Sequence, residues 1–291
     1  MTHHRSVIAS LGSGVAMWAA IGVARSASAD TTLFDNGVFV TGAGTGVNAG
    51  FQVSQAESSV VSIGFNANAT TAQGGPIRVT DDFVVSGAPA GGVRLSHMHF
   101  YGVQTNTVTS DVHFGAFYVA IHDGPPFAGG NLIAGDFTTN RLLSSTFSGV
   151  YRLSMSGAPA TNRPVTRLDV DMTWAPRLAN GTYWMTVSAV GDSSIATTPN
   201  PQTIFVTPHP ATANAQQYFN STWFAIWDLP FTLFALCPAD FNASHAVSVQ
   251  DIFDFLAAWF VNDPRADFNG AGGVSVQDIF DFLGAWFAAC A

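Results

Sequence analysis

The C-terminal part of the sequence is a tandem repeat. Residues 239–260, ADFNASHAVSVQDIFDFLAAWF, recur as residues 266–287, ADFNGAGGVSVQDIFDFLGAWF. The second halves of the copies differ only where Ala257 is matched by Gly284. Each copy opens with a polar stretch and continues with apolar residues at helical spacing. The repeat therefore predicts a small α-helical module of two loops and two helices, residues 237–291.

The polar part of each copy has the donor spacing of a calcium loop. In such a loop, oxygen ligands come from the first, third, fifth, seventh and ninth positions and from a carboxylate at the twelfth. The first loop offers Asp240, Asn242, Ser244, the carbonyl of Ala246, Ser248 and Asp251. The second offers Asp267, Asn269, the carbonyl of Gly273, Ser275 and Asp278. Because this pattern occurs twice, the sequence predicts a duplicated site with calcium as its cofactor.

A second interpretation of these residues is purely structural. Ser248 with Asp251, and Ser275 with Asp278, have the spacing of helix N-caps with an acid in the first turn. The two roles can coexist, and capping in a loop that has lost its metal stays an alternative.

The first 29 residues have the order of a secretory signal. A basic tip at Arg5 is followed by an apolar run over residues 7–24 and by small residues at Ala27 and Ala29. We predict a signal peptide at residues 1–29 and a secreted or extracellular mature chain with no membrane span. A retained N-terminal anchor is the alternative.

The two cysteines, Cys237 and Cys290, stand just outside the repeat. In an exported chain, such a pair favours a disulfide over a redox site. We predict a bridge that closes the module and, in the chain-entropy model, stabilises it by about 4 kcal/mol.

Residues 30–236 have a composition typical of β structure. Charged residues make up 10% of the chain, against about 25% in ordinary soluble domains. The net charge of −9 disfavours nucleic acid as a partner. Short apolar runs separated by Gly, Pro and Asn predict an antiparallel β-sandwich. Strands are expected at residues 59–65, 77–85, 93–103, 114–122, 150–155, 165–172, 182–190, 203–206 and 231–236.

Residues that could carry chemistry are few in this region. His97 and His99 share one face of a strand and could chelate a metal, although a polar surface is the simpler interpretation. Glu57 is the only Glu in the chain. The close carboxylate pairs are Asp81 with Asp82 and Asp169 with Asp171. We expect both pairs on solvent faces or turns, so the sequence predicts no catalytic site.

Two tryptophans on an expected strand have even spacing. Trp223 and Trp227 should therefore lie on one face of a sheet. Core packing is the favoured role, and a platform for stacking sugars is the alternative.

Parts of this region resemble a known kind of domain. The strings VTDDFVV, IHDGPPFAGGNLIAGDFTTNRLLSSTFSGVYRL, NRPVTRLDVDM and LANGTYWMTV are similar to the sandwich domain of secreted bacterial proteins with interchangeable C-terminal anchors. The resemblance implies an extracellular β-sandwich and no named catalytic residue.

The repeat resembles dockerin modules, in particular the planctomycete-type variant that ends in QDIFDFLAAWF and is flanked by cysteines. It departs from that family at the fifth and sixth loop positions. These usually hold an acid and Gly, whereas this chain has Ser244 and His245, then Ala271 and Gly272. Fewer charged ligands should weaken both sites, and His245 at a sharp turn should weaken the first one further.

The two expected helices, residues 249–260 and 276–287, each have an apolar arc of about 200°, wider than one core-facing stripe. The residues left over as candidates for a partner-binding surface are Phe253, Phe260, Phe280 and Phe287. Packing of these rings against the sandwich is the alternative.

The resemblance to dockerins implies docking to a cohesin-like or cell-envelope protein. We expect a non-catalytic secreted protein anchored through its calcium module. A carbohydrate-binding or polysaccharide-degrading subunit of a dockerin-linked complex is the alternative.

Overall fold

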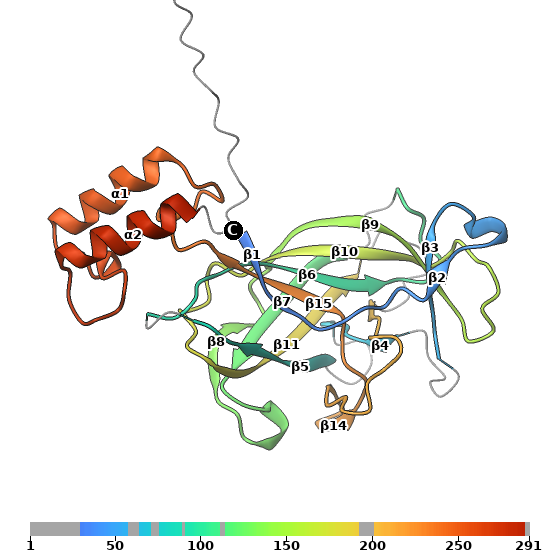
Figure 1. Ribbon diagram of the computed structural model, residues 1–291. Helices are drawn as coiled ribbons and strands as arrows, with labels where there is room; N and C mark the ends of the chain where they lie inside the picture. The colour runs from blue at the N-terminus through green and yellow to red at the C-terminus, as the bar shows by residue number, and fades with distance from the viewer. Residues whose placement is uncertain are drawn as a thin grey trace, which may run out of the picture.

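A computed structural model describes residues 30–57, 64–70, 76–88, 91–110, 114–191 and 201–288. This part of the chain is mainly β, with two sheets and two C-terminal helices (Figure 1). The strands lie between Asp30 and Leu236, and we call this part the β domain. The expected signal peptide lies outside the described residues. No helix within the described ranges is long and apolar enough to cross a membrane.

In the first sheet, the first and last strands of the β domain lie side by side at one edge. Its strand order is β1 (Asp30–Asp35), β15 (Phe231–Leu236), β6 (Leu95–Val103), β10 (Pro164–Asp171), β9 (Leu142–Leu153), β3 (Gln52–Gln55) and β2 (Gly42–Ala43). The short strand β12 (Gln202–Thr203) pairs with β6, and β4 (Phe65–Asn66) pairs with β12. The strand β15 is therefore hydrogen-bonded on both sides, to β1 and to β6, in antiparallel fashion. The pair β3 and β9 is parallel.

The second sheet is antiparallel throughout its described strands. Its order is β14 (Thr222–Ala225), β13 (Gln216–Phe219), β5 (Arg78–Val85), β11 (Gly181–Gly191), β7 (Phe114–His122) and β8 (Leu132–Asp136). Single turns of 3-10 helix, η1 (Gly46–Asn48) and η2 (Pro126–Ala128), lie in the loops.

The larger of two hydrophobic clusters in the described part of the β domain lies between the two sheets. Side chains alternate between the faces of a strand, so every second residue of β5, including Val79, Phe83 and Val85, points inward. Met98 and Phe100 of β6 meet them from the first sheet. Burying each such side chain contributes about 1.5–3 kcal/mol.

Some of the expected strands coincide with strands of the structure, and others differ in their bounds. The prediction for residues 114–122 coincides with β7, and the one for 77–85 nearly coincides with β5. The prediction of 150–155 overlaps the end of β9, but its start is wrong, because β9 begins eight residues earlier, at Leu142, in a half whose side chains lack a clear alternation of burial. Most of the expected strand 59–65 lies outside the described residues.

The repeat folds as two helices that lie side by side at one end of the β domain (Figure 1). They are α1 (Val249–Phe260) and α2 (Val276–Ala288), with the turn η3 (Pro264–Ala266) between them. At their centre the rings of Phe255 and Phe282 stack at 4.2 Å with an interplanar angle of 1°, and both are fully buried.

Two reciprocal hydrogen bonds tie each helix to the loop of the other repeat. Trp259 Nε1 donates to the carbonyl of Ser275 at 2.7 Å, and Trp286 Nε1 donates to the carbonyl of Ser248 at 2.8 Å. The repeated sequence thus forms a repeated structure.

The predicted disulfide involves one described residue. Cys237 is buried, and no cysteine in the described part of the chain is free. Its expected partner Cys290 lies outside the described residues, so the bridge stays a prediction.

Candidate calcium loops and their surroundings

The first loop turns its carboxylates inward onto its own backbone. Asp240 accepts hydrogen bonds from the N–H groups of Ser244 at 2.9 Å and His245 at 2.8 Å. Asp251 accepts from the N–H of Asn242 at 3.3 Å and from Ser248, through its N–H at 2.8 Å and its hydroxyl at 3.1 Å. The twelfth-position acid therefore closes the loop and also forms the capping box of α1.

The second loop repeats this arrangement with one difference. Asp278 accepts from the N–H of Asn269 at 3.2 Å and from the N–H and hydroxyl of Ser275, both at 2.8 Å. Asp267 accepts from the N–H of Gly272 at 3.0 Å through Oδ2. The other oxygen, Oδ1, is buried and has no hydrogen-bond partner among the described residues. A buried carboxylate oxygen without a donor is costly, and a cation would satisfy it.

The acids of the loops sit in different electrostatic surroundings. Burial raises the pKa of Asp240 above its ordinary value, against the hydrogen bonds from Ser244 and His245. Burial also opposes ionisation of Asp278, but hydrogen bonds from Ser275 and Asn269 hold its pKa below the ordinary value. A divalent cation beside Asp240 would favour its ionised form.

The donor set of the loops is mixed. Within the described ranges, no group of three or more His, Cys, Asp and Glu side chains is placed to hold a metal ion. Each loop contributes only two carboxylates at ligand positions, and the rest of its oxygens are amide, hydroxyl and carbonyl oxygens. Calcium accepts such hard oxygen donors, whereas zinc prefers nitrogen and sulfur.

His97 and His99 do share a face, as their spacing predicts, with ring centroids 5.2 Å apart. Each is paired with an acid: His97 Nδ1 lies 3.1 Å from Asp30 Oδ2, and His99 Nε2 lies 3.2 Å from Asp169 Oδ1. These contacts place both rings in a network of polar side chains on the first sheet.

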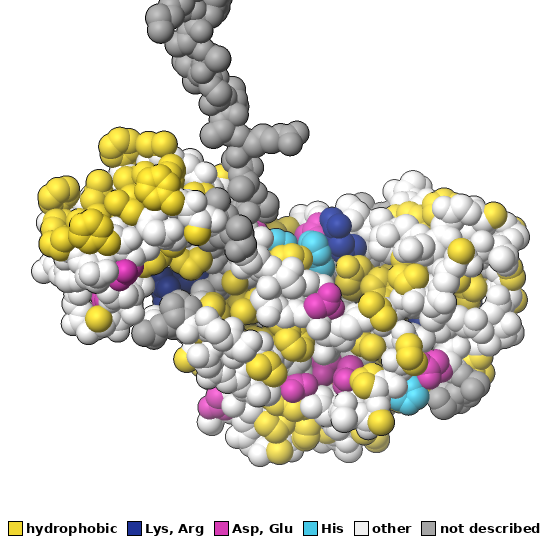
Figure 2. Space-filling view, viewed as in Figure 1, with side chains coloured by type: hydrophobic (Ala, Val, Ile, Leu, Met, Phe, Trp, Pro, Cys, Tyr) yellow, Lys and Arg dark blue, Asp and Glu magenta, His cyan; other side chains and the backbone are white. Residues whose placement is uncertain are grey.

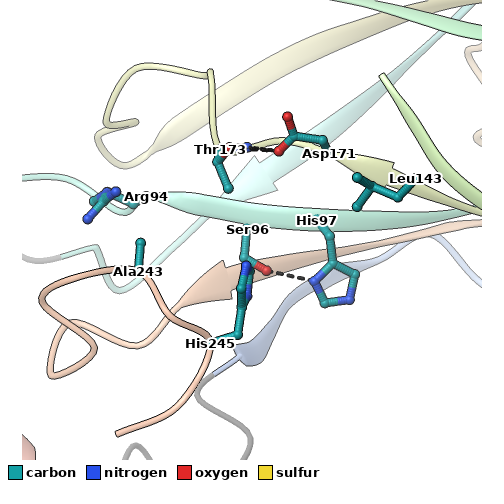
Figure 3. Close-up of a pocket in the computed structure, with 8 residues that line it drawn as sticks. All are labelled: Arg94, Ser96, His97, Leu143, Asp171, Thr173, Ala243 and His245. Carbon is teal, nitrogen blue, oxygen red and sulfur yellow. Dashed lines mark hydrogen bonds between the residues drawn. The ribbon is translucent and has the colours of Figure 1, made fainter. Parts of the chain in front are cut away.

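A cavity of about 580 Å³ lies where the first loop meets the β domain (Figure 3). It is lined from the β domain by Arg94, Ser96, His97, Leu143, Asp171 and Thr173, and from the loop by Ala243 and His245. The two parts of the chain therefore face each other across a space lined by both polar and apolar groups.

The four phenylalanines singled out in the helices are exposed. Phe253, Phe260, Phe280 and Phe287 expose 61–76% of their surface. Val249 and Val276 are also exposed on the same helices. Figure 2 shows hydrophobic side chains gathered over the helical module. The rings do not pack against the β domain, which was the alternative.

Two sequence-based expectations in the β domain are wrong. Asp81 is not on a solvent face: it is fully buried, because it lies on the inward-facing side of β5, while the neighbouring Asp82 points the other way. Trp223 and Trp227 do not share a face, since β14 ends at Ala225. Trp223 packs with Tyr218, and Trp227 stacks on His209 at 3.8 Å.

Comparison with known proteins adds no assignment. Neither protein-family models, nor curated proteins, nor solved structures contain a match for this chain.

Proposed function

We propose that this chain is a non-catalytic secreted protein in which a calcium-binding, dockerin-like module docks a β-sandwich domain to an extracellular assembly or cell surface. The matched exposure of Phe253 with Phe280 and of Phe260 with Phe287 carries the proposal. Exposed apolar side chains gathered on one part of a surface are typical of protein interaction sites. A cohesin-like or cell-envelope protein is the partner that the proposal implies.

The inward-facing oxygens of both loops support the calcium part of the proposal. Asp240 and Asp251 in the first loop, and Asp267 and Asp278 in the second, would hold the ion together with the amide, hydroxyl and carbonyl oxygens of the loops. Calcium would neutralise paired carboxylates and fix the loop that begins each helix. The residues that dock are then presented on helices with fixed ends.

We expect the second loop to bind calcium more tightly than the first. The turn residue of the second loop is Gly272, with φ 99°, whereas the first loop uses His245 with φ 61°, a conformation that strains a residue with a β-carbon. Asp267→Ala should remove the tighter of two calorimetric transitions and Asp240→Ala the weaker. Each substitution should weaken calcium binding by its loop more than about tenfold, because losing a group that only orients a metal ligand already weakens metal binding about tenfold.

Equal losses in the two variants would contradict this order. Ser244 works against it, because the second loop has Ala271 in the corresponding position and thus one side-chain oxygen fewer. No heat of binding in the unaltered chain would refute the calcium proposal itself, leaving capping of the helices as the role of these acids.

Charged substitutions of the exposed rings test whether they form the docking surface. Phe253→Asp combined with Phe280→Asp should abolish capture of the partner from a panel of cohesin-like domains and a cell-envelope extract, while calcium-dependent folding persists. Either single change should leave substantial binding, because the near-identical helices offer the partner two equivalent orientations. Surface plasmon resonance measures capture, and circular dichroism controls for folding.

Two results would contradict this prediction. Unfolding of the double variant would show that the rings are part of the core. Complete loss of capture from one single change would exclude binding in two orientations.

A further inference from the structure

The two loops differ in the residue that makes their sharp turn. The second loop turns through Gly272, while the first turns through His245 in the left-handed region of φ. Only glycine adopts this region without a steric penalty, so a histidine there destabilises the loop unless its side chain makes a compensating contact.

His245 makes such a contact with the β domain. Its Nδ1 lies 3.1 Å from Oδ2 of Asp30, the first residue of β1. The same carboxylate oxygen lies 3.1 Å from Nδ1 of His97 on β6. The Asp30 side chain is only 9% exposed, so it lies largely out of water between the two rings. One carboxylate thus joins the first calcium loop to two strands of the first sheet.

On the side of the β domain, further contacts hold His97 in place. The pairing of β6 with β15 is irregular between Leu233 and Ala235, where Phe234 lies. His97 stacks on Phe234, with ring centroids 4.3 Å apart and an angle of 9°. Its Nδ1 also lies 2.7 Å from the hydroxyl of Ser96, as Figure 3 shows. A strand irregularity of this kind redirects side chains, and here it gives His245 a preformed docking point.

We propose that His245 is an interdomain latch: through Asp30 and His97 it fixes the orientation of the helical module on the β domain. His245 lowers the calcium affinity of the first loop, because a glycine at this position would adopt the same turn without strain. The statement about affinity rests on the calcium binding proposed above. The latch itself does not, since both of its contacts are made by side chains other than the proposed calcium ligands.

Three variants of the full chain separate the two halves of the proposal. His245→Gly should relax the turn and remove the latch, so that first-loop calcium affinity rises up to about tenfold and the domains reorient freely. Asp30→Asn should free the domains without raising affinity. Ala243→Gly is the matched control: Ala243 has φ 58° in the same loop and lines the same cavity. It should raise affinity and leave the domains fixed.

Residual dipolar couplings, measured by NMR with calcium and with a chelator, report domain orientation. If the contact through His245 and Asp30 is intact, the β domain and the module share one alignment tensor. If the contact is broken, the module aligns more weakly than the β domain. Calorimetry gives the affinities. Shared alignment in both His245→Gly and Asp30→Asn overturns the latch. If the shared alignment is lost in His245→Gly but kept in Asp30→Asn, the role of Asp30 is overturned. Absence of calcium binding with a latch still detectable in chelator refutes the calcium proposal and leaves the latch standing.

Discussion

Phe255→Ala should unfold the helical module while the β domain stays folded. The ring of Phe255 is fully buried and stacks on Phe282 at the centre of the module. Truncating a buried Phe costs about 3–5 kcal/mol. A single core of this size supplies no more than about 3–5 kcal/mol before any disulfide is counted. The substitution therefore removes about all the stability that the core provides.

Loss of the helical circular dichroism signal, with the near-ultraviolet signal of the β domain retained, would show this result. The chain offers its own control two residues away. Phe253→Ala removes the same number of atoms from an exposed ring and should change stability by less than about 1 kcal/mol. The pair Phe282→Ala and Phe280→Ala should behave in the same way. Similar destabilisation by buried and exposed substitutions would contradict the packing described here.

Asp81→Ala should destabilise the β domain by about 3 kcal/mol or more, because each buried donor left unpaired costs about 1–3 kcal/mol. Oδ2 of Asp81 accepts from Asn36 Nδ2 and from the N–H of Leu229, both at 2.7 Å. Oδ1 accepts from the N–H of Asp82 at 2.9 Å. The carboxyl group therefore joins β5 to the residues that follow β1 and to those that precede β15, two neighbouring strands of the first sheet. Urea denaturation monitored by tryptophan fluorescence measures the loss.

The same residue gives a pH dependence whose sign follows from its surroundings. Burial, reinforced by the nearby carboxylate of Asp228, raises the pKa of Asp81 well above its usual range, although hydrogen bonds from Leu229 and Asp82 oppose the shift. The folded state then binds the proton more tightly than the unfolded state. This contribution to stability is complete below the unfolded pKa and is lost as the pH rises through the folded pKa.

Asp81→Ala should abolish that decline, which urea midpoints at a series of pH values would reveal. Asp82→Ala is the matched control, since Asp82 is the next residue on the same strand but faces the opposite side and is only half-buried. It should change stability by less than about 1 kcal/mol and keep the pH dependence. A large effect of Asp82→Ala together with a small one of Asp81→Ala would reverse the assignment of the two faces.

The helical module could be predicted from sequence because its signals are local. Helical periodicity and the Ser-x-x-Asp caps fix where each helix begins, and α1 coincides with its predicted bounds. The strand β7 was predictable for a similar reason, since its apolar run is bounded by turn residues.

Contacts between distant parts of the chain could not be predicted in this way. The pairing of β1 with β15 and the contact of Asp30 with His245, 215 residues apart, have no local signal. Asp81 was misplaced because two adjacent acids suggest solvent, and only the register of β5 shows which of them points inward. The role of His245 was likewise hidden: the sequence shows the departure from Gly, but only the fold shows what the ring contacts.

The attachment of the module to β15 has a mechanical consequence. The helical module begins at Cys237, directly after β15 ends at Leu236, and β15 is flanked by antiparallel partners on both sides. A pull applied through a docked module runs along the axis of β15. Both ladders of hydrogen bonds are then loaded in shear at the same time, so they resist together instead of opening one pair after another. Tension on the module would thus be shared between the two strands that flank β15, the edge strand β1 and the inner strand β6.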